Sequence, residues 1–171
     1  MPDNARLTLL LGGARSGKSR HAEQLVTGRP APWMYIATAQ SFDAEMDERI
    51  ALHRTRRTDG WETIEEPHDL AGVLTKLPKG RPVLVDCLTL WLTNRMLAEA
   101  DLEKECTRLE AVLAAPRGPW FVVSNEVGLG IVPDNALARR FRDAAGRLNQ
   151  QVAARADRVL FMVAGLPMQV K

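Results

Sequence analysis

Residues 12–19, Gly12-Gly13-Ala14-Arg15-Ser16-Gly17-Lys18-Ser19, combine glycines, a lysine and a hydroxyl at the spacing G-x-x-x-x-G-K-[ST]. Glycines let successive backbone N–H groups point inward, so that the loop can cradle phosphate groups. At this spacing the lysine reaches the β- and γ-phosphates, and the last hydroxyl binds magnesium. We therefore predict that all eight residues bind a nucleoside triphosphate, with Lys18 also catalytic and Ser19 a ligand of Mg²⁺.

The alternative interpretation is a glycine-rich turn between a strand and a helix, with an incidental lysine. The context favours the phosphate site, because an apolar run precedes the loop and a helical pattern follows it. A helix that begins at the loop also directs the positive end of its dipole at the phosphates.

A carboxylate at the end of a second buried strand is expected to complete the magnesium site. Asp86 follows the mostly apolar residues 82–85 and is our predicted second metal ligand and a nucleotide-binding residue. An aspartate in this position is also a common helix N-cap, so the assignment depends on the phosphate loop.

His53 is the candidate nucleophile among the three histidines. It follows Met46 by seven residues in a helical pattern, on the face expected to point inward. Neighbouring arginines favour the neutral imidazole and could neutralise charge on a phosphate oxygen. A neutral histidine can attack phosphorus and hold a nucleotidyl group covalently. The alternative is a histidine at the edge of the core beside solvated arginines, and His21 and His68 are interpreted as structural.

An alternation of strands and helices must position these residues. Short apolar runs predict strands at residues 7–11, 33–38, 63–65, 82–86, 120–124 and 158–163. Helical patterns lie between them at 17–27, 43–57, 69–77, 89–114 (one broken helix or two) and 135–156. This alternation predicts an α/β fold with a mostly parallel sheet flanked by helices, in a single domain spanning residues 1–171.

Composition excludes several classes of protein. The 23 basic and 21 acidic residues nearly cancel, so no nucleic-acid partner is expected. No apolar run approaches the roughly 20 residues of a membrane span, and the N-terminus does not resemble a signal peptide. The two cysteines fit no metal spacing and indicate free thiols, which favours a cytoplasmic location.

Further motifs accompany the phosphate loop along almost the whole chain. They are Arg20-His21-Ala22-Glu23 directly after the loop, Tyr35-Ile36-Ala37-Thr38-Ala39-Gln40, Arg49-Ile50 with His53, residues 61–65, Asp86-Cys87-Leu88-Thr89 with Trp91-Leu92-Thr93-Asn94, Asn125-Glu126-Val127-Gly128-Leu129-Gly130-Ile131-Val132-Pro133, Arg140-Phe141-Arg142-Asp143, Gly146-Arg147, Asn149-Gln150, Gly165-Leu166-Pro167 and Lys171. In this order they resemble the bifunctional adenosylcobinamide kinase / adenosylcobinamide-phosphate guanylyltransferase family of cobalamin synthesis.

The resemblance implies a P-loop NTPase fold of the RecA-like kind and an enzyme with two activities. ATP or GTP would phosphorylate adenosylcobinamide, and GTP would then donate GMP to adenosylcobinamide phosphate through a covalent guanylyl-histidine. By position His53 matches that histidine. The resemblance also implies a homo-oligomer, a trimer, and further nucleotide-contacting residues at Thr38, Ala39, Gln40, Arg54, Thr55, Arg56, Arg57 and Glu65.

Two other functions remain open on the sequence. One is a different small-molecule kinase in which His53 is structural. The other is a nucleotide switch or motor ATPase module, although the guanine-reading signature Asn-Lys-x-Asp is absent and no basic channel is evident. The loop 125–133 leaves a strand at the edge where ligands of α/β proteins bind, but without the resemblance we favour an ordinary turn before a helix.

Overall fold

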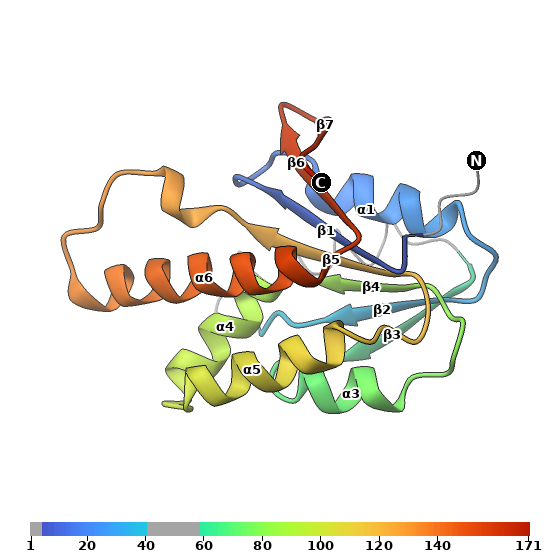
Figure 1. Cartoon of the computed structure of the whole chain (residues 1–171), viewed down its shortest axis with the longest axis horizontal. Helices are drawn as coiled ribbons and strands as arrows, with labels where there is room; N and C mark the ends of the chain where they lie inside the picture. Colours follow the sequence, from blue (N-terminus) through green and yellow to red (C-terminus); the bar gives the residue numbers. More distant parts are fainter. Residues whose placement is uncertain (1–4, 41–58) are drawn as a thin grey trace.

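Seven strands of the described residues form one sheet, and helices cover both of its faces (Figure 1). The computed structural model describes residues 5–40 and 59–171. Along the chain the strands are β1 (Leu7–Gly12), β2 (Trp33–Ala37), β3 (Trp61–Glu65), β4 (Val83–Asp86), β5 (Trp120–Asn125), β6 (Arg158–Val163) and β7 (Leu166–Gln169). Their order across the sheet is β3-β2-β4-β5-β1-β6-β7.

All neighbouring strands are parallel except β6 and β7, which form an antiparallel hairpin. In a parallel arrangement the carboxyl ends of the strands meet at one edge. The register pairs Gly12 of β1 with Asn125 of β5, and Asp86 of β4 with Val123 of β5. The phosphate loop and Asp86 therefore both leave this edge, with β5 between them.

Helices fill the two layers beside the sheet. They are α1 (Lys18–Thr27), α3 (Leu70–Lys76), α4 (Leu88–Leu97), α5 (Leu102–Leu113) and α6 (Ala136–Arg155), with the short 3₁₀ helix η1 (Val127–Leu129) before α6. Ala22 and Val26 of α1 pack on one face, against Leu10, Phe121 and other strand residues. The remaining helices pack on the opposite face (Figure 1). Alternate residues of each central strand thus enter different cores, which explains why these strands are apolar without alternation.

The predicted α/β fold with a mostly parallel sheet is confirmed, and so are the six predicted strands. Residues 89–114 form two helices, and Asp101 caps the second by accepting a hydrogen bond from the Lys104 backbone at 3.2 Å. Strand β7 was not predicted. The helix expected at 43–57 falls outside the described residues. Within the described part of the chain, every helix is too short or too polar to cross a membrane.

Candidate nucleotide-binding site

The phosphate loop connects the end of β1 to the start of α1, and two of its glycines are required by the backbone. Gly12 has φ 154°, and a Cβ placed there would lie 2.7 Å from Ser16 Oγ and 2.9 Å from the Met162 carbonyl. Gly17 is the N-cap of α1 and has the left-handed conformation, φ 92°. Only glycine adopts such conformations without cost. The glycine spacing that predicted the loop therefore has a direct structural cause.

Lys18 is the first residue of α1, and its side chain is folded back into the loop. Its Nζ donates to the Gly13 carbonyl at 2.5 Å and to Ser16 Oγ at 3.4 Å. Only 7% of the residue is exposed. Burial lowers the pKa of the ammonium, while Cys87 and Asp86 act in the opposite direction. The cation thus already occupies the concave side of the loop, beside the backbone amides that phosphate would contact.

The β6–β7 hairpin supports the loop from the other side. The backbone N–H of Gly165 donates to the Ser16 carbonyl at 3.0 Å. A Cβ on Gly17 would lie 3.3 Å from the Gly165 Cα, so the two backbones approach closely. This hairpin was not predicted from the sequence, and only the motif Gly165-Leu166-Pro167 marks its position in the chain.

Asp86 ends β4 and is partly buried. The Tyr35 hydroxyl, from the neighbouring strand β2, donates to Asp86 Oδ2 at 3.1 Å. Tyr35 is itself buried, and the Trp61 ring packs on it edge to face at 6.0 Å. One carboxylate oxygen is thereby fixed by a neutral donor, and the carboxylate keeps lone pairs for a cation.

Thr38 holds the ends of β2 and β4 together. Its hydroxyl donates to the Cys87 carbonyl at 2.6 Å and accepts from the Cys87 N–H at 2.8 Å. Its carbonyl accepts from Asn94 Nδ2 of α4 at 2.7 Å. The side chain is fully buried, so it fixes the backbone directly after Asp86. Cys87 is buried too, and burial together with the Asp86 charge raises the pKa of its thiol to about 11.

Glu65 ends β3, and Gln40 lies three residues beyond the end of β2, at the far side of the same edge. Gln40 Nε2 lies 3.2 Å from His68 Nε2, and Arg95 Nη1 lies 3.3 Å from His68 Nδ1. Because arginine can only donate, Nδ1 accepts from Arg95, and a neutral ring then carries its proton on Nε2. Glu65 is exposed and pairs in register with Ala37, while Ala39 is half-buried beside Gln40.

The oxygen donors at this edge suit magnesium. Mg²⁺ prefers hard oxygen ligands and is usually bound through one or two protein groups together with water and substrate phosphates. The hydroxyl of Ser19, in the first turn of α1, and the carboxylate of Asp86 provide such a pair. No cluster of three or more His, Cys, Asp or Glu side chains forms a cage for a metal within residues 5–40 and 59–171.

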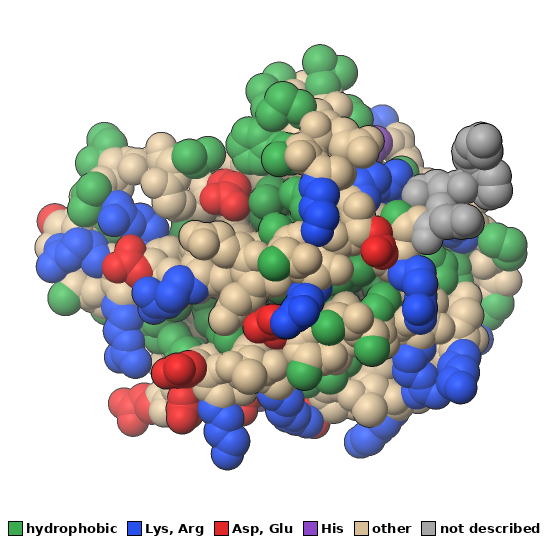
Figure 2. Space-filling view, viewed as in Figure 1, with side chains coloured by type: hydrophobic (Ala, Val, Ile, Leu, Met, Phe, Trp, Pro, Cys, Tyr) green, Lys and Arg blue, Asp and Glu red, His purple; other side chains and the backbone are tan. Residues whose placement is uncertain are grey.

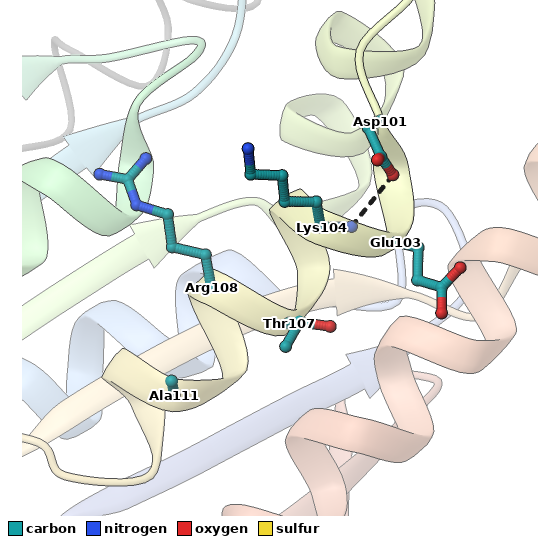
Figure 3. Close-up of a pocket in the computed structure, with 6 residues that line it drawn as sticks. All are labelled: Asp101, Glu103, Lys104, Thr107, Arg108 and Ala111. Atoms are coloured by element: carbon teal, nitrogen blue, oxygen red, sulfur yellow. Dashed lines mark hydrogen bonds between the residues drawn. The ribbon is translucent and has the colours of Figure 1, made fainter.

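A surface depression lies away from this edge of the sheet. It is an open hollow of about 490 Å³ along one side of α5, bordered by Asp101, Lys104, Thr107 and Arg108 (Figure 3). Its side chains are exposed, and Arg108 is already paired with Asp69 at 2.8 Å. All of its lining residues come from a single helix and its N-cap, so we assign it no role.

His53, Arg54, Thr55, Arg56 and Arg57 fall outside the described residues.

The fold and the phosphate loop together define a P-loop NTPase of the RecA-like kind. An ATPase of the type III secretion system of pathogenic bacteria has a similar structure, with a TM-score of 0.51 over 96% of this chain and 56% of that chain, at 12% identity. At the level of sequence, the family model described as cobinamide kinase / cobinamide phosphate guanyltransferase matches residues 8–170. The chain belongs to that family.

Two curated relatives illustrate the similarity. The bifunctional adenosylcobalamin biosynthesis protein CobP of Pseudomonas aeruginosa is 52% identical over 95% of this chain and 96% of its own length. The bifunctional adenosylcobalamin biosynthesis protein CobU of Salmonella typhimurium is 40% identical over 96% of this chain and 99% of its own. The resemblance found in the sequence is confirmed, and with it the predicted enzyme class, a bifunctional kinase and guanylyltransferase.

Proposed function

We propose that this chain phosphorylates adenosylcobinamide with ATP or GTP, and then transfers GMP from GTP to adenosylcobinamide phosphate through a guanylyl-histidine at His53. The product is adenosylcobinamide-GDP. The observation that carries the proposal is the juxtaposition, at one sheet edge, of the Lys18 loop and the Asp86 carboxylate in a member of this family.

Binding of the triphosphate uses groups that the loop already holds in place. Lys18 Nζ exchanges the Gly13 carbonyl for β- and γ-phosphate oxygens, and the N–H groups of the loop and of the first turn of α1 surround the same oxygens. Ser19 and Asp86 would hold Mg²⁺, which supplies neutralising charge on the phosphates when bound. The phosphate negative charge keeps the Lys18 ammonium protonated in the complex, against the effect of its burial.

One triphosphate site serves both reactions in this proposal. In the first, the acceptor hydroxyl attacks the γ-phosphorus; in the second, the His53 imidazole attacks the α-phosphorus of GTP and pyrophosphate leaves. Placement of the attacking group decides which bond breaks. Thr38, Ala39, Gln40, Arg54, Thr55, Arg56, Arg57 and Glu65 remain proposed nucleotide contacts.

The guanylyl-histidine is tested with GTP labelled at the α-phosphate. Incubation with Mg²⁺ and no corrinoid should leave acid-labile, base-stable label on the denatured wild-type chain. His53→Ala should carry none, whereas the matched control His21→Ala should label like the wild type. Full labelling of His53→Ala would exclude His53 as the nucleophile. An unlabelled wild type that still phosphorylates adenosylcobinamide would favour the simple kinase instead. Lys18→Ala should abolish both labelling and phosphorylation, and its full activity would remove the loop from the mechanism.

We further propose that the chain acts as a homo-oligomer, a trimer by resemblance to its family. Large apolar side chains are exposed on the segment between η1 and α6 and on β7 and the residues after it. They are Leu129, Ile131, Val132, Leu137, Leu166, Met168 and Val170, and Figure 2 shows apolar side chains gathered on the β6–β7 hairpin. Exposed apolar side chains grouped in this way are typical of subunit contacts. The free, buried thiols of Cys87 and Cys106 support a reducing, cytoplasmic location.

A further inference from the structure

Glu126 is the first residue beyond β5, the strand that lies between the phosphate-loop strand β1 and the Asp86 strand β4. Its backbone N–H donates to the Gly12 carbonyl at 3.1 Å, immediately before the loop. A triphosphate held by Lys18 on one side and by Asp86 through its metal on the other must lie above the end of β5. Glu126 is therefore next to the triphosphate end of the nucleotide, where phosphoryl transfer takes place.

The Glu126 carboxylate is held by a buried residue of α6. Asn149 Nδ2 donates to Glu126 Oε1 at 3.0 Å and to the Asn125 carbonyl at 3.1 Å. Asn149 Oδ1 accepts from the Ser124 hydroxyl at 2.7 Å. The carbonyl and carboxylate oxygens beside Nδ2 can only accept, so they fix the orientation of the amide. Asn149 is 5% exposed, and such a buried, satisfied network is rigid.

The second carboxylate oxygen, Oε2, makes no hydrogen bond to any residue that the structure describes. A carboxylate beside a polyphosphate repels the phosphate oxygens, so it is useful there only as a metal ligand or as an acceptor for a proton. Ser19 and Asp86 already provide the usual protein ligands of a P-loop magnesium. The function left for Glu126 is to accept a hydrogen bond, and then a proton, from a hydroxyl.

We propose that Glu126 is the base for the acceptor hydroxyl in the phosphoryl-transfer reaction, and that Asn149 is its positioning residue. This inference rests on the proposed function. The acceptor hydroxyl is that of the aminopropanol arm of adenosylcobinamide. Its oxygen forms a bond to the γ-phosphorus, and the bond from that phosphorus to the β,γ-bridging oxygen breaks. The hydroxyl proton passes to Glu126 Oε2 and the nucleoside diphosphate leaves; the proton is afterwards released to water.

Phosphorylation of adenosylcobinamide needs an acceptor hydroxyl, whereas labelling of His53 by GTP does not. A base for the hydroxyl should therefore affect the first reaction and not the second. Glu126→Gln keeps an oxygen for Asn149 and removes the base. We expect the kcat of γ-phosphate transfer from ATP to adenosylcobinamide to fall about 100-fold or more, the size typical of a lost base. The KM for ATP and the labelling by α-labelled GTP should stay within about twofold of the wild type. Glu110→Gln, the same change on α5, is the matched control and should alter neither reaction.

The role of Asn149 is tested by a double-mutant cycle. Asn149→Asp keeps an acceptor for Ser124 but turns an oxygen toward Glu126, so it should lower the same kcat while sparing labelling. In the Glu126→Gln background it should add little further loss, because the glutamine amide can donate to the new carboxylate. If the two substitutions instead lower kcat independently, so that their effects multiply in the double variant, Asn149 acts only through the fold.

An unchanged kcat in Glu126→Gln would overturn the proposal, and so would an equal fall in labelling and phosphorylation, which would place Glu126 in nucleotide or metal binding. Failure of the proposed function looks different, because the wild type itself would then be inactive with adenosylcobinamide. If the wild type phosphorylates adenosylcobinamide but is not labelled by GTP, ATP binding measured by calorimetric titration replaces labelling as the measurement that involves no acceptor.

Discussion

At the scale of single residues, Tyr35 governs the carboxylate that is proposed to bind magnesium. Its hydroxyl donates to Asp86 Oδ2, and its ring is fixed by the Trp61 ring on the adjacent strand. Groups that orient a metal ligand in this way typically change metal affinity by about 10- to 100-fold when they are removed.

Tyr35→Phe removes that donor and keeps the aromatic packing. We expect the Mg²⁺ concentration for half-maximal phosphorylation to rise about 10-fold, with a loss of unfolding free energy of only about 1 kcal/mol. The measurement is a magnesium titration at saturating nucleotide. Trp61→Phe perturbs the packing without touching the hydroxyl and should leave the magnesium dependence unchanged. Equal magnesium curves for wild type and Tyr35→Phe would show that the Asp86 position does not depend on Tyr35.

The residues that the sequence predicted are those whose chemistry is local. Gly12, Gly17 and Lys18 lie in one short loop, and each has a conformational or electrostatic reason for its place in the motif. Asn149 and Tyr35 could not be assigned in this way, because their partners are 23 and 51 residues away in sequence. Only the packing of α6, and the pairing of β2 with β4, brings these groups to the site.

At the scale of elements, the start of the phosphate loop is held against β6. Gly12 pairs with Met162 in the parallel register, and there is no room between them for a side chain. The next residue, Gly13, differs, because a Cβ placed there would meet nothing within 4 Å.

Gly12→Ala should therefore lower the free energy of unfolding by about 2 kcal/mol or more, since a methyl group is forced against a backbone carbonyl and the positive φ is strained. Gly13→Ala is the matched control in the same loop and should cost less than about 1 kcal/mol. Urea unfolding monitored by tryptophan fluorescence measures both. Equal stabilities for the two variants would mean that β6 gives way at little cost.

The regular elements were predictable where burial imposes a pattern. Strands β1, β4 and β5 are covered on both faces and read as continuous apolar runs. Strand β7 could not be found in this way. All four of its residues are exposed, one is a proline, and its pairing with β6 places it at the edge of the sheet.

At the scale of the whole molecule, the exposed apolar side chains are concentrated on the η1–α6 segment and the C-terminal hairpin. Ile131 is 97% exposed and Leu166 is 71% exposed. A water-exposed surface of this kind is costly unless another surface covers it.

Ile131→Glu and Leu166→Glu should shift the protein from an oligomer toward the 19.0 kDa chain mass, because a buried, unpaired charge opposes subunit contact. Light scattering coupled to gel filtration gives the mass directly. Leu97→Glu, a 59% exposed position at the end of α4, serves as the control and should keep the wild-type mass. A monomeric wild type would contradict the proposed assembly.

The buried polar network behind β5 also constrains how chains of this kind can diverge. Thr89, Ser124 and Asn149 are buried and exchange hydrogen bonds with one another and with the backbone of Asn125. Replacing any one of them with an apolar residue leaves a desolvated donor or acceptor on the others. Substitutions at these three positions should therefore be inherited as a set, so that homologues carry either the whole trio or a jointly altered one.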